Sequence, residues 1–146
     1  MNTCEVDWPM LISDVLHHIE RNLDNGITGT DIAIEYGVSL YVLKRVFRAL
    51  CGIGLAQYIR ERKLSEAGKE MAICKLGVLE AAIKYGYESA DSFSRAFKGF
   101  HGITPSQITN VAALKILTPI QLSISKTGGS YQNLNIKTIM KKESMI

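Results

Sequence analysis

The chain has 146 residues, 47% of them hydrophobic, and a formal net charge of +3 at pH 7. This length and apolar content allow a compact core and exclude a chain that is disordered throughout. The net charge does not by itself indicate nucleic acid, because five lysines and one glutamate after Asn110 leave residues 1–110 with a net charge of −1.

The first predicted element is an amphipathic helix that starts at about Pro9. Its apolar residues recur at helical spacing, and Asn25-Gly26 is expected to end it. The apolar residues that recur in this helix are Leu11, Ile12, Val15, Leu16, Ile19 and Leu23.

An internal repeat follows, in which residues 31–59 match residues 80–108. Ala33-Ile34 and Tyr36-Gly37 recur as Ala82-Ile83 and Tyr85-Gly86, at an offset of 49 residues. The inserted Glu88 then shifts the offset to 50. The later matches are Ser39 with Ser89, Arg45 with Arg95, Phe47 with Phe97, Gly52 with Gly102, Ile53 with Ile103 and Gln57 with Gln107.

Each copy predicts a helix-turn-helix unit, with a short helix, a glycine turn and a second helix capped by serine. In the first unit, at about 28–52, residues 30–36 precede Gly37, and the second helix runs from Ser39 to about Leu50. In the second unit, at about 77–101, residues 78–85 precede Gly86, and the second helix runs from Ser89 to about Gly99.

A longer helix is predicted between the units, over residues 55–71. Its length is about 25 Å at about 1.5 Å per residue, enough to hold the units apart. Gly68 interrupts its pattern at a cost of about 1 kcal/mol relative to alanine, which indicates either close packing or simple tolerance. We expect its core-facing residues to be Tyr58, Ile59, Leu64, Ala67 and Met71.

Thr104-Pro105 has the form of a further helix start. Residues 109–119 are then expected to form a linker. In residues 120–146, alternating apolar residues on either side of Gly128-Gly129 predict two strands of a hairpin. Because an isolated hairpin is marginal in water, this tail must pack on the body, pair with a partner or fluctuate.

The second helix of each unit is the candidate reader of DNA. Arginine and lysine donate to guanine or to phosphates, a tyrosine contacts a thymine methyl, and aspartate accepts from cytosine N4. The outward-facing candidates are Tyr41, Lys44, Arg45 and Arg48 in the first unit and Ala90, Asp91, Ser94, Arg95 and Lys98 in the second. The aromatic residues assigned to the core are Phe47, Phe93, Phe97 and Phe100.

Taken alone, the exposed face of either helix is equally consistent with DNA recognition and with an ordinary solvated surface. The repeat favours recognition, because Arg45 and Arg95 occupy the same place in the same motif.

The segments SLYVLKRVFRALCGIGLAQYIRERKLSEA and EAAIKYGYESADSFSRAFKGFHGITPSQ resemble the DNA-binding domain of AraC/XylS transcriptional regulators. The resemblance covers roughly residues 8–108, and the DNA-binding domain is assigned to 1–108. It implies an all-α fold of seven helices that binds adjacent major grooves as a monomer. It further implies DNA contacts at Tyr41, Lys44, Arg45, Ala90, Asp91, Ser94 and Arg95. Three positions depart from the family's common pattern, Gly54, Leu55 and Gly77, and they weaken helix starts rather than recognition.

The tail TPIQLSISKTGGSYQNLNIKTI is similar to the start of the gyrase-inhibitor-like effector domain of Rob-type regulators. The resemblance implies a shortened form of such a regulator, which keeps the DNA-binding domain and has lost the effector domain.

Sequence-specific transcriptional regulation, through a promoter or through RNA polymerase, is therefore the leading hypothesis. One alternative is a truncated interaction module that modulates a full-length regulator or RNA polymerase and binds DNA weakly. A third is small-molecule binding by the tail.

Other classes of function are disfavoured. No nucleophile–base pair, carboxylate dyad or phosphate loop is present, so we expect no enzyme activity and no cofactor. Three separate cysteines, without a CxxC pair, fit reduced, buried thiols in the cytoplasm and no metal site. No apolar run reaches the roughly 18 residues that span a membrane. We therefore expect a soluble activator or repressor.

Overall fold

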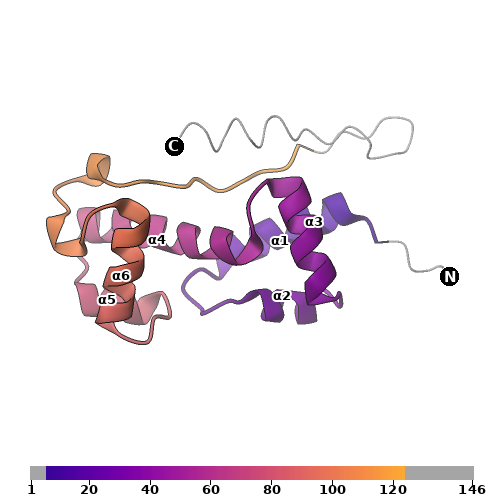
Figure 1. Ribbon diagram of the computed structural model, residues 1–146, viewed down its shortest axis with the longest axis horizontal. Helices are drawn as coiled ribbons and strands as arrows, with labels where there is room; N and C mark the ends of the chain where they lie inside the picture. The colour runs from indigo at the N-terminus through magenta and orange to yellow at the C-terminus, as the bar shows by residue number, and fades with distance from the viewer. Residues whose placement is uncertain (1–5, 124–146) are drawn as a thin grey trace.

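The computed structural model describes residues 6–123, which form six α-helices and two 3₁₀ turns and contain no strand (Figure 1). The helices are α1 (Trp8–Arg21), α2 (Gly29–Glu35), α3 (Leu40–Cys51), α4 (Leu55–Cys74), α5 (Val78–Lys84) and α6 (Ala90–His101). The turns are η1 (Pro105–Gln107) and η2 (Val111–Ala113). The predicted all-α fold with two helix-turn-helix units is confirmed. Residues 124–146, with most of the predicted hairpin, lie outside the described residues.

The implied count of seven helices is wrong for residues 6–123. Thr104-Pro105 starts only the single turn η1. The Gln107 side chain accepts a hydrogen bond from the Thr104 backbone N–H at 2.8 Å, and Ile108 then adopts an extended backbone. The chain therefore leaves the turn extended instead of continuing as a helix.

The repeat seen in the sequence is also a repeat of backbone conformation. Gly37 and Gly86 have positive φ values of 64° and 80° at the turns between the paired helices. A side chain would strain the backbone there, which explains glycine at both places. The Ser39 and Ser89 hydroxyls accept from backbone N–H groups in the first turns of α3 and α6, at 3.3 and 3.0 Å, as the predicted caps require.

Helix α4 joins the two units, with α2 and α3 at one end and α5 and α6 at the other (Figure 1). It ends at Cys74 rather than at Met71, so its 20 residues span about 30 Å. The five residues predicted to face the core are all buried. Buried residues occur around much of α4, because it packs on both units and on the segment that follows α6.

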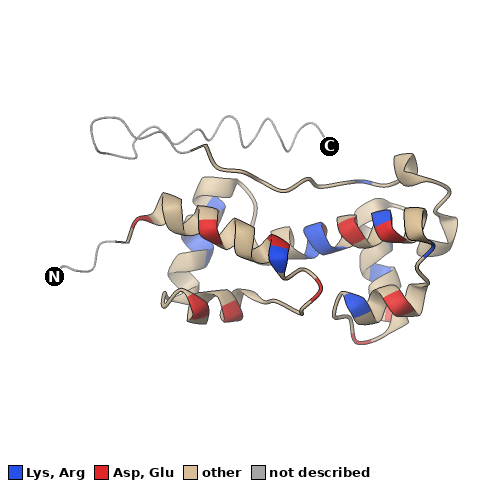
Figure 2. Cartoon of the chain, turned by 180° about the vertical axis from the view of Figure 1, so that it is seen from behind, with Lys and Arg blue, Asp and Glu red and all other residues tan. Residues whose placement is uncertain are grey.

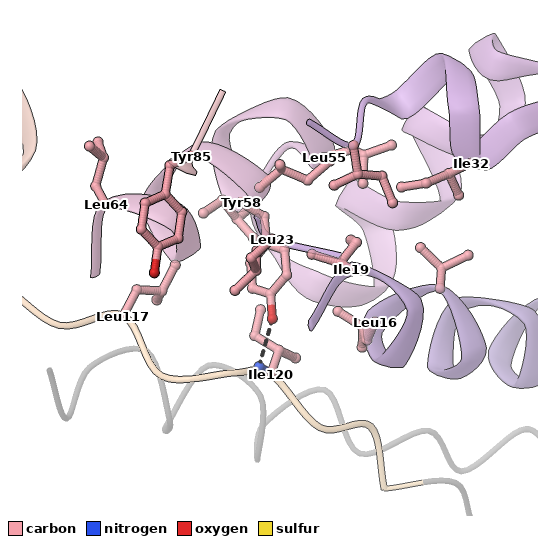
Figure 3. Close-up of a cluster of buried hydrophobic side chains, with 14 of the residues drawn as sticks. Leu16, Ile19, Leu23, Ile32, Leu55, Tyr58, Leu64, Tyr85, Leu117 and Ile120 are labelled. Carbon is pink, nitrogen blue, oxygen red and sulfur yellow. Dashed lines mark hydrogen bonds between the residues drawn. The ribbon is translucent and has the colours of Figure 1, made fainter. Parts of the chain in front are cut away.

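The predicted linker, residues 109–119, packs along α4. Leu117 and Ile120 are buried, and the Ile120 backbone N–H donates to the Tyr58 hydroxyl at 3.0 Å (Figure 3). The Leu117 backbone N–H donates to the Ser65 hydroxyl at 2.8 Å. Burial raises the pKa of Tyr58 above its ordinary value. The chain beyond α6 is therefore part of the folded body at least as far as Ile120.

Three smaller expectations are corrected. Helix α1 ends at Arg21, before Asn25-Gly26, because the Asn22 side chain caps it by donating to the His18 carbonyl at 2.8 Å. Phe100 is only half-buried, and the Lys115 ammonium lies 5.2 Å from its ring centroid. Cys51 is buried as expected, whereas Cys74 is exposed at the end of α4.

No helix within residues 6–123 is long and apolar enough to cross a membrane.

Gly68 marks a close contact between α4 and the end of α6. A Cβ at this position would lie 3.1 Å from both His101 Nε2 and Leu114 Cδ1. The imidazole has little room to yield, because Nδ1 accepts from the Lys115 backbone N–H at 3.0 Å and Nε2 lies 2.8 Å from the Leu64 carbonyl oxygen. Of the two interpretations left open by the sequence, close packing is therefore the right one.

We expect Gly68→Ala to lower the free energy of unfolding by about 1 kcal/mol. Overpacking costs about 1–3 kcal/mol, and the better helix propensity of alanine returns at most about 1 kcal/mol. Urea denaturation measures the change. Gly99→Ala is the matched control, because a Cβ on Gly99 within α6 meets nothing within 4 Å and should stabilise the helix. Equal stability of the two variants would contradict this packing argument.

Candidate nucleic-acid interface

Helix α3 buries one side and leaves a basic face open. Leu43 and Phe47 are fully buried, while Tyr41 is 68% exposed. Lys44, Arg45 and Arg48 are also exposed, and none of them forms a salt bridge within the described residues. This face therefore has cationic donors that are available to an anionic partner.

Tyr41 and Arg45 form a pair on this face, one helical turn apart. The Arg45 guanidinium carbon lies 5.7 Å from the centre of the Tyr41 ring, within the range of a cation–π contact. The Arg48 side chain instead reaches the turn into α4. A Cβ built on Gly54 in this turn would lie 3.6 Å from Arg48 Nη1. The structure thus groups Tyr41 with Arg45 and separates Arg48 from them.

Helix α6 presents a different pair at the equivalent positions. Asp91 and Arg95 are joined by an ion pair between Oδ2 and Nη2, and their side chains are 70% and 80% exposed. Ala90 and Ser94 are half-buried, and Lys98 is exposed. Since the offset between the units is 50 here, Asp91 takes the place of Tyr41 beside the matching arginine.

The exposed Asp91–Arg95 pair contributes little to the stability of the fold, about 0–1 kcal/mol, and an incoming partner can replace it. Both residues are predicted from the sequence as candidates, but their pairing is not. The available signal was their spacing of four residues on one helix, which makes them neighbours on its surface.

The two helices lie on the same side of the molecule. In Figure 1, α6 lies in front of one end of α4, while α3 lies beside its other end and in front of α1. Seen from behind in Figure 2, α1 and α4 lie in front of them. The basic residues of α3 have no acidic residue among them, whereas acidic and basic residues are mixed along α4. The two helices that carry the exposed Arg45 and Arg95 thus lie on one side of the molecule, joined by α4.

Known proteins resemble this chain in sequence and in fold. A family described as a helix-turn-helix domain matches residues 16–110. The HTH-type transcriptional activator AarP of Providencia stuartii is 43% identical over 96 residues, which are 66% of this chain and 71% of AarP. Transcriptional regulator Rob of Salmonella typhimurium is 29% identical over 120 residues, which cover 80% of this chain and 42% of Rob.

Solved structures show the same fold at lower identity. The DNA-binding domain of AdpA, solved in complex with a target DNA, has a TM-score of 0.57 and 20% identity. The match covers 70% of this chain and 88% of that domain.

Proposed function

The chain belongs to the AraC type of helix-turn-helix transcriptional regulators, and on this premise we propose that it reads two adjacent major-groove segments of DNA as a monomer. In this proposal, α3 enters one segment and α6 the next. Transcription is then regulated at a promoter, by occupancy or by contact with RNA polymerase, in the cytoplasm.

One observation carries the proposal: exposed arginines stand at equivalent positions of a repeated unit, on two helices that lie on the same side of the molecule. Half-sites on one face of DNA are about 34 Å apart, and α4 spans about 30 Å. The DNA complex of the AdpA domain supports the same kind of partner. A single reading helix would not need this duplication.

Within the proposal, the candidate residues divide into two groups. Arg45 and Arg95 meet base edges, with Tyr41 and Asp91 setting the direction of their guanidinium groups. The exposed cations Lys44, Arg48 and Lys98 meet phosphates, while Ala90 and Ser94 line the surface of α6 closest to the bases. Base contacts carry specificity, and phosphate contacts carry affinity that depends on salt.

We expect selection from random duplexes at fixed salt to yield a site bound at least about 10³-fold more tightly than random duplex. With about six to ten phosphate contacts, the logarithm of affinity should fall with the logarithm of salt at about −0.9 per contact. Sedimentation should give one protein per selected site. Equal affinity for selected and random duplex, or two proteins per site, would contradict the proposal.

A further inference from the structure

A hollow of about 290 Å³ lies where the two helix-turn-helix units meet. Its walls are residues 27–29 before and at the start of α2, one side of α4, and residues 85–87 between α5 and α6. A Cβ on Gly86 would lie 3.5 Å from the Gly26 Cα, so the two units approach each other closely beside it. The hollow is thus built by both units and the helix that joins them.

Two cations line this hollow without an anion. Arg60 and Lys63 stand one turn apart on α4, and neither forms a salt bridge within residues 6–123. No aspartate or glutamate is among the lining residues. Lys63 is half-buried, and its burial lowers the pKa of the ammonium group. A half-buried charge without a partner is costly, and binding an anion would remove that cost.

The other cations of α4 provide a contrast. The Lys69 ammonium lies 2.9 Å from the Glu66 carboxylate, and the Arg62 guanidinium contacts both Glu20 and Glu66. Two of the four described cations of α4 are therefore paired within the fold. The other two, Arg60 and Lys63, form no salt bridge within the described residues, and both line the same hollow.

The position of the hollow indicates which anion it meets. If α3 and α6 occupy successive major-groove segments, the part of the protein between these helices faces the sugar–phosphate backbones that border the intervening minor groove. The hollow lies at this middle position, between the two units. A backbone phosphate then arrives with the DNA and meets both cations.

We propose that this hollow binds a DNA backbone phosphate between the two major-groove segments, with Lys63 and Arg60 as its ligands. The inference rests on the proposed function and adds a contact that neither reading helix makes.

The test is a double-mutant cycle between the protein and single neutral methylphosphonates placed along the selected duplex. Lys63→Met should weaken binding equally on selected and random duplex and reduce the salt slope by about 0.9. Methylphosphonate at one central phosphate should weaken the wild-type protein but not weaken Lys63→Met further. Lys69→Met is the control and should show neither effect, and thermal denaturation checks that each variant folds.

The outcomes separate this inference from the proposed function. A retained two-segment footprint with no central phosphate coupled to Lys63 would overturn the inference and leave the proposed function standing. If the wild-type protein itself bound no DNA site specifically, the proposed function would fail, and this inference would fail with it. Stabilisation by inorganic phosphate that depends on Lys63, with unchanged affinity of Lys63→Met for DNA, would show a free-phosphate site and also overturn the assignment to DNA.

Discussion

Replacing Arg62 by methionine is expected to lower the free energy of unfolding by about 3 kcal/mol. Arg62 is 2% exposed and donates hydrogen bonds to the Glu20 and Glu66 carboxylates and to the Leu117 carbonyl. It thereby joins α1, α4 and the segment after α6. We expect the lower end of the range for a broken buried ion pair, because the two carboxylates keep 28% and 30% exposure to water.

Arg60→Met is the matched control, because Arg60 is exposed on the same helix and forms no ion pair within the described residues. Its stability, measured by urea denaturation, should stay within about 0.5 kcal/mol of the wild type. An Arg62→Met protein as stable as Arg60→Met would show that the network does not hold the segment after α6.

The same network predicts how stability depends on pH. Burial tends to raise the pKa of Glu66, but hydrogen bonds from Lys69 and Arg62 outweigh it and hold the pKa below its ordinary value of 4.5. A carboxyl whose pKa is lowered by folding stabilises the protein above its unfolded pKa, and this contribution is lost as pH falls through the folded pKa. Arg62→Met should therefore show a shallower loss of stability below about pH 4.5.

The second large effect concerns binding. Arg45→Ala and Arg95→Ala should each weaken the specific complex by about 1–3 kcal/mol, since each removes a base contact, and should relax specificity only in its own segment. Both arginines are exposed, so the fold should be unaffected. Competition with duplexes altered in one segment at a time measures the effect. A loss that is uniform over all sequences would identify a phosphate contact instead.

Asp91 offers a sharper comparison within the same experiment. Because its carboxylate repels phosphates and holds Arg95, Asp91→Ala should raise affinity for random duplex and reduce discrimination in the α6 segment. Arg21→Ala is the control, since Arg21 is an exposed arginine in the last turn of α1, which is not a reading helix. A change in specificity for Arg21→Ala comparable to that for Arg95→Ala would undermine the assigned roles.

The repeated unit was predictable because local chemistry dictates it. Glycines at Gly37 and Gly86 supply the positive φ that the turns need, and Ser39 and Ser89 supply caps. The apolar stripes of α3 and α6 then fix which sides are buried, and so leave Arg45 and Arg95 exposed. These features depend on residues close together in sequence.

The features that sequence reasoning missed depend on distant residues. Arg62 lies among other charged residues of α4, and nothing local marks it as buried; Glu20 and Leu117, its partners, come from opposite ends of the described chain. The packing of residues 114–122 was missed for the same reason, because it depends on hydroxyls of Tyr58 and Ser65. The hollow at Lys63 exists only once both units are in place.

Hydroxyl-radical footprinting and methylation interference on the selected duplex test the central claim most directly. Two protected major-groove segments should appear about 10 bp apart on one face. Arg45→Ala should weaken protection in one of them and Arg95→Ala in the other. Protection of a single segment, or an effect of both substitutions on the same segment, would contradict recognition of DNA by two matched helices.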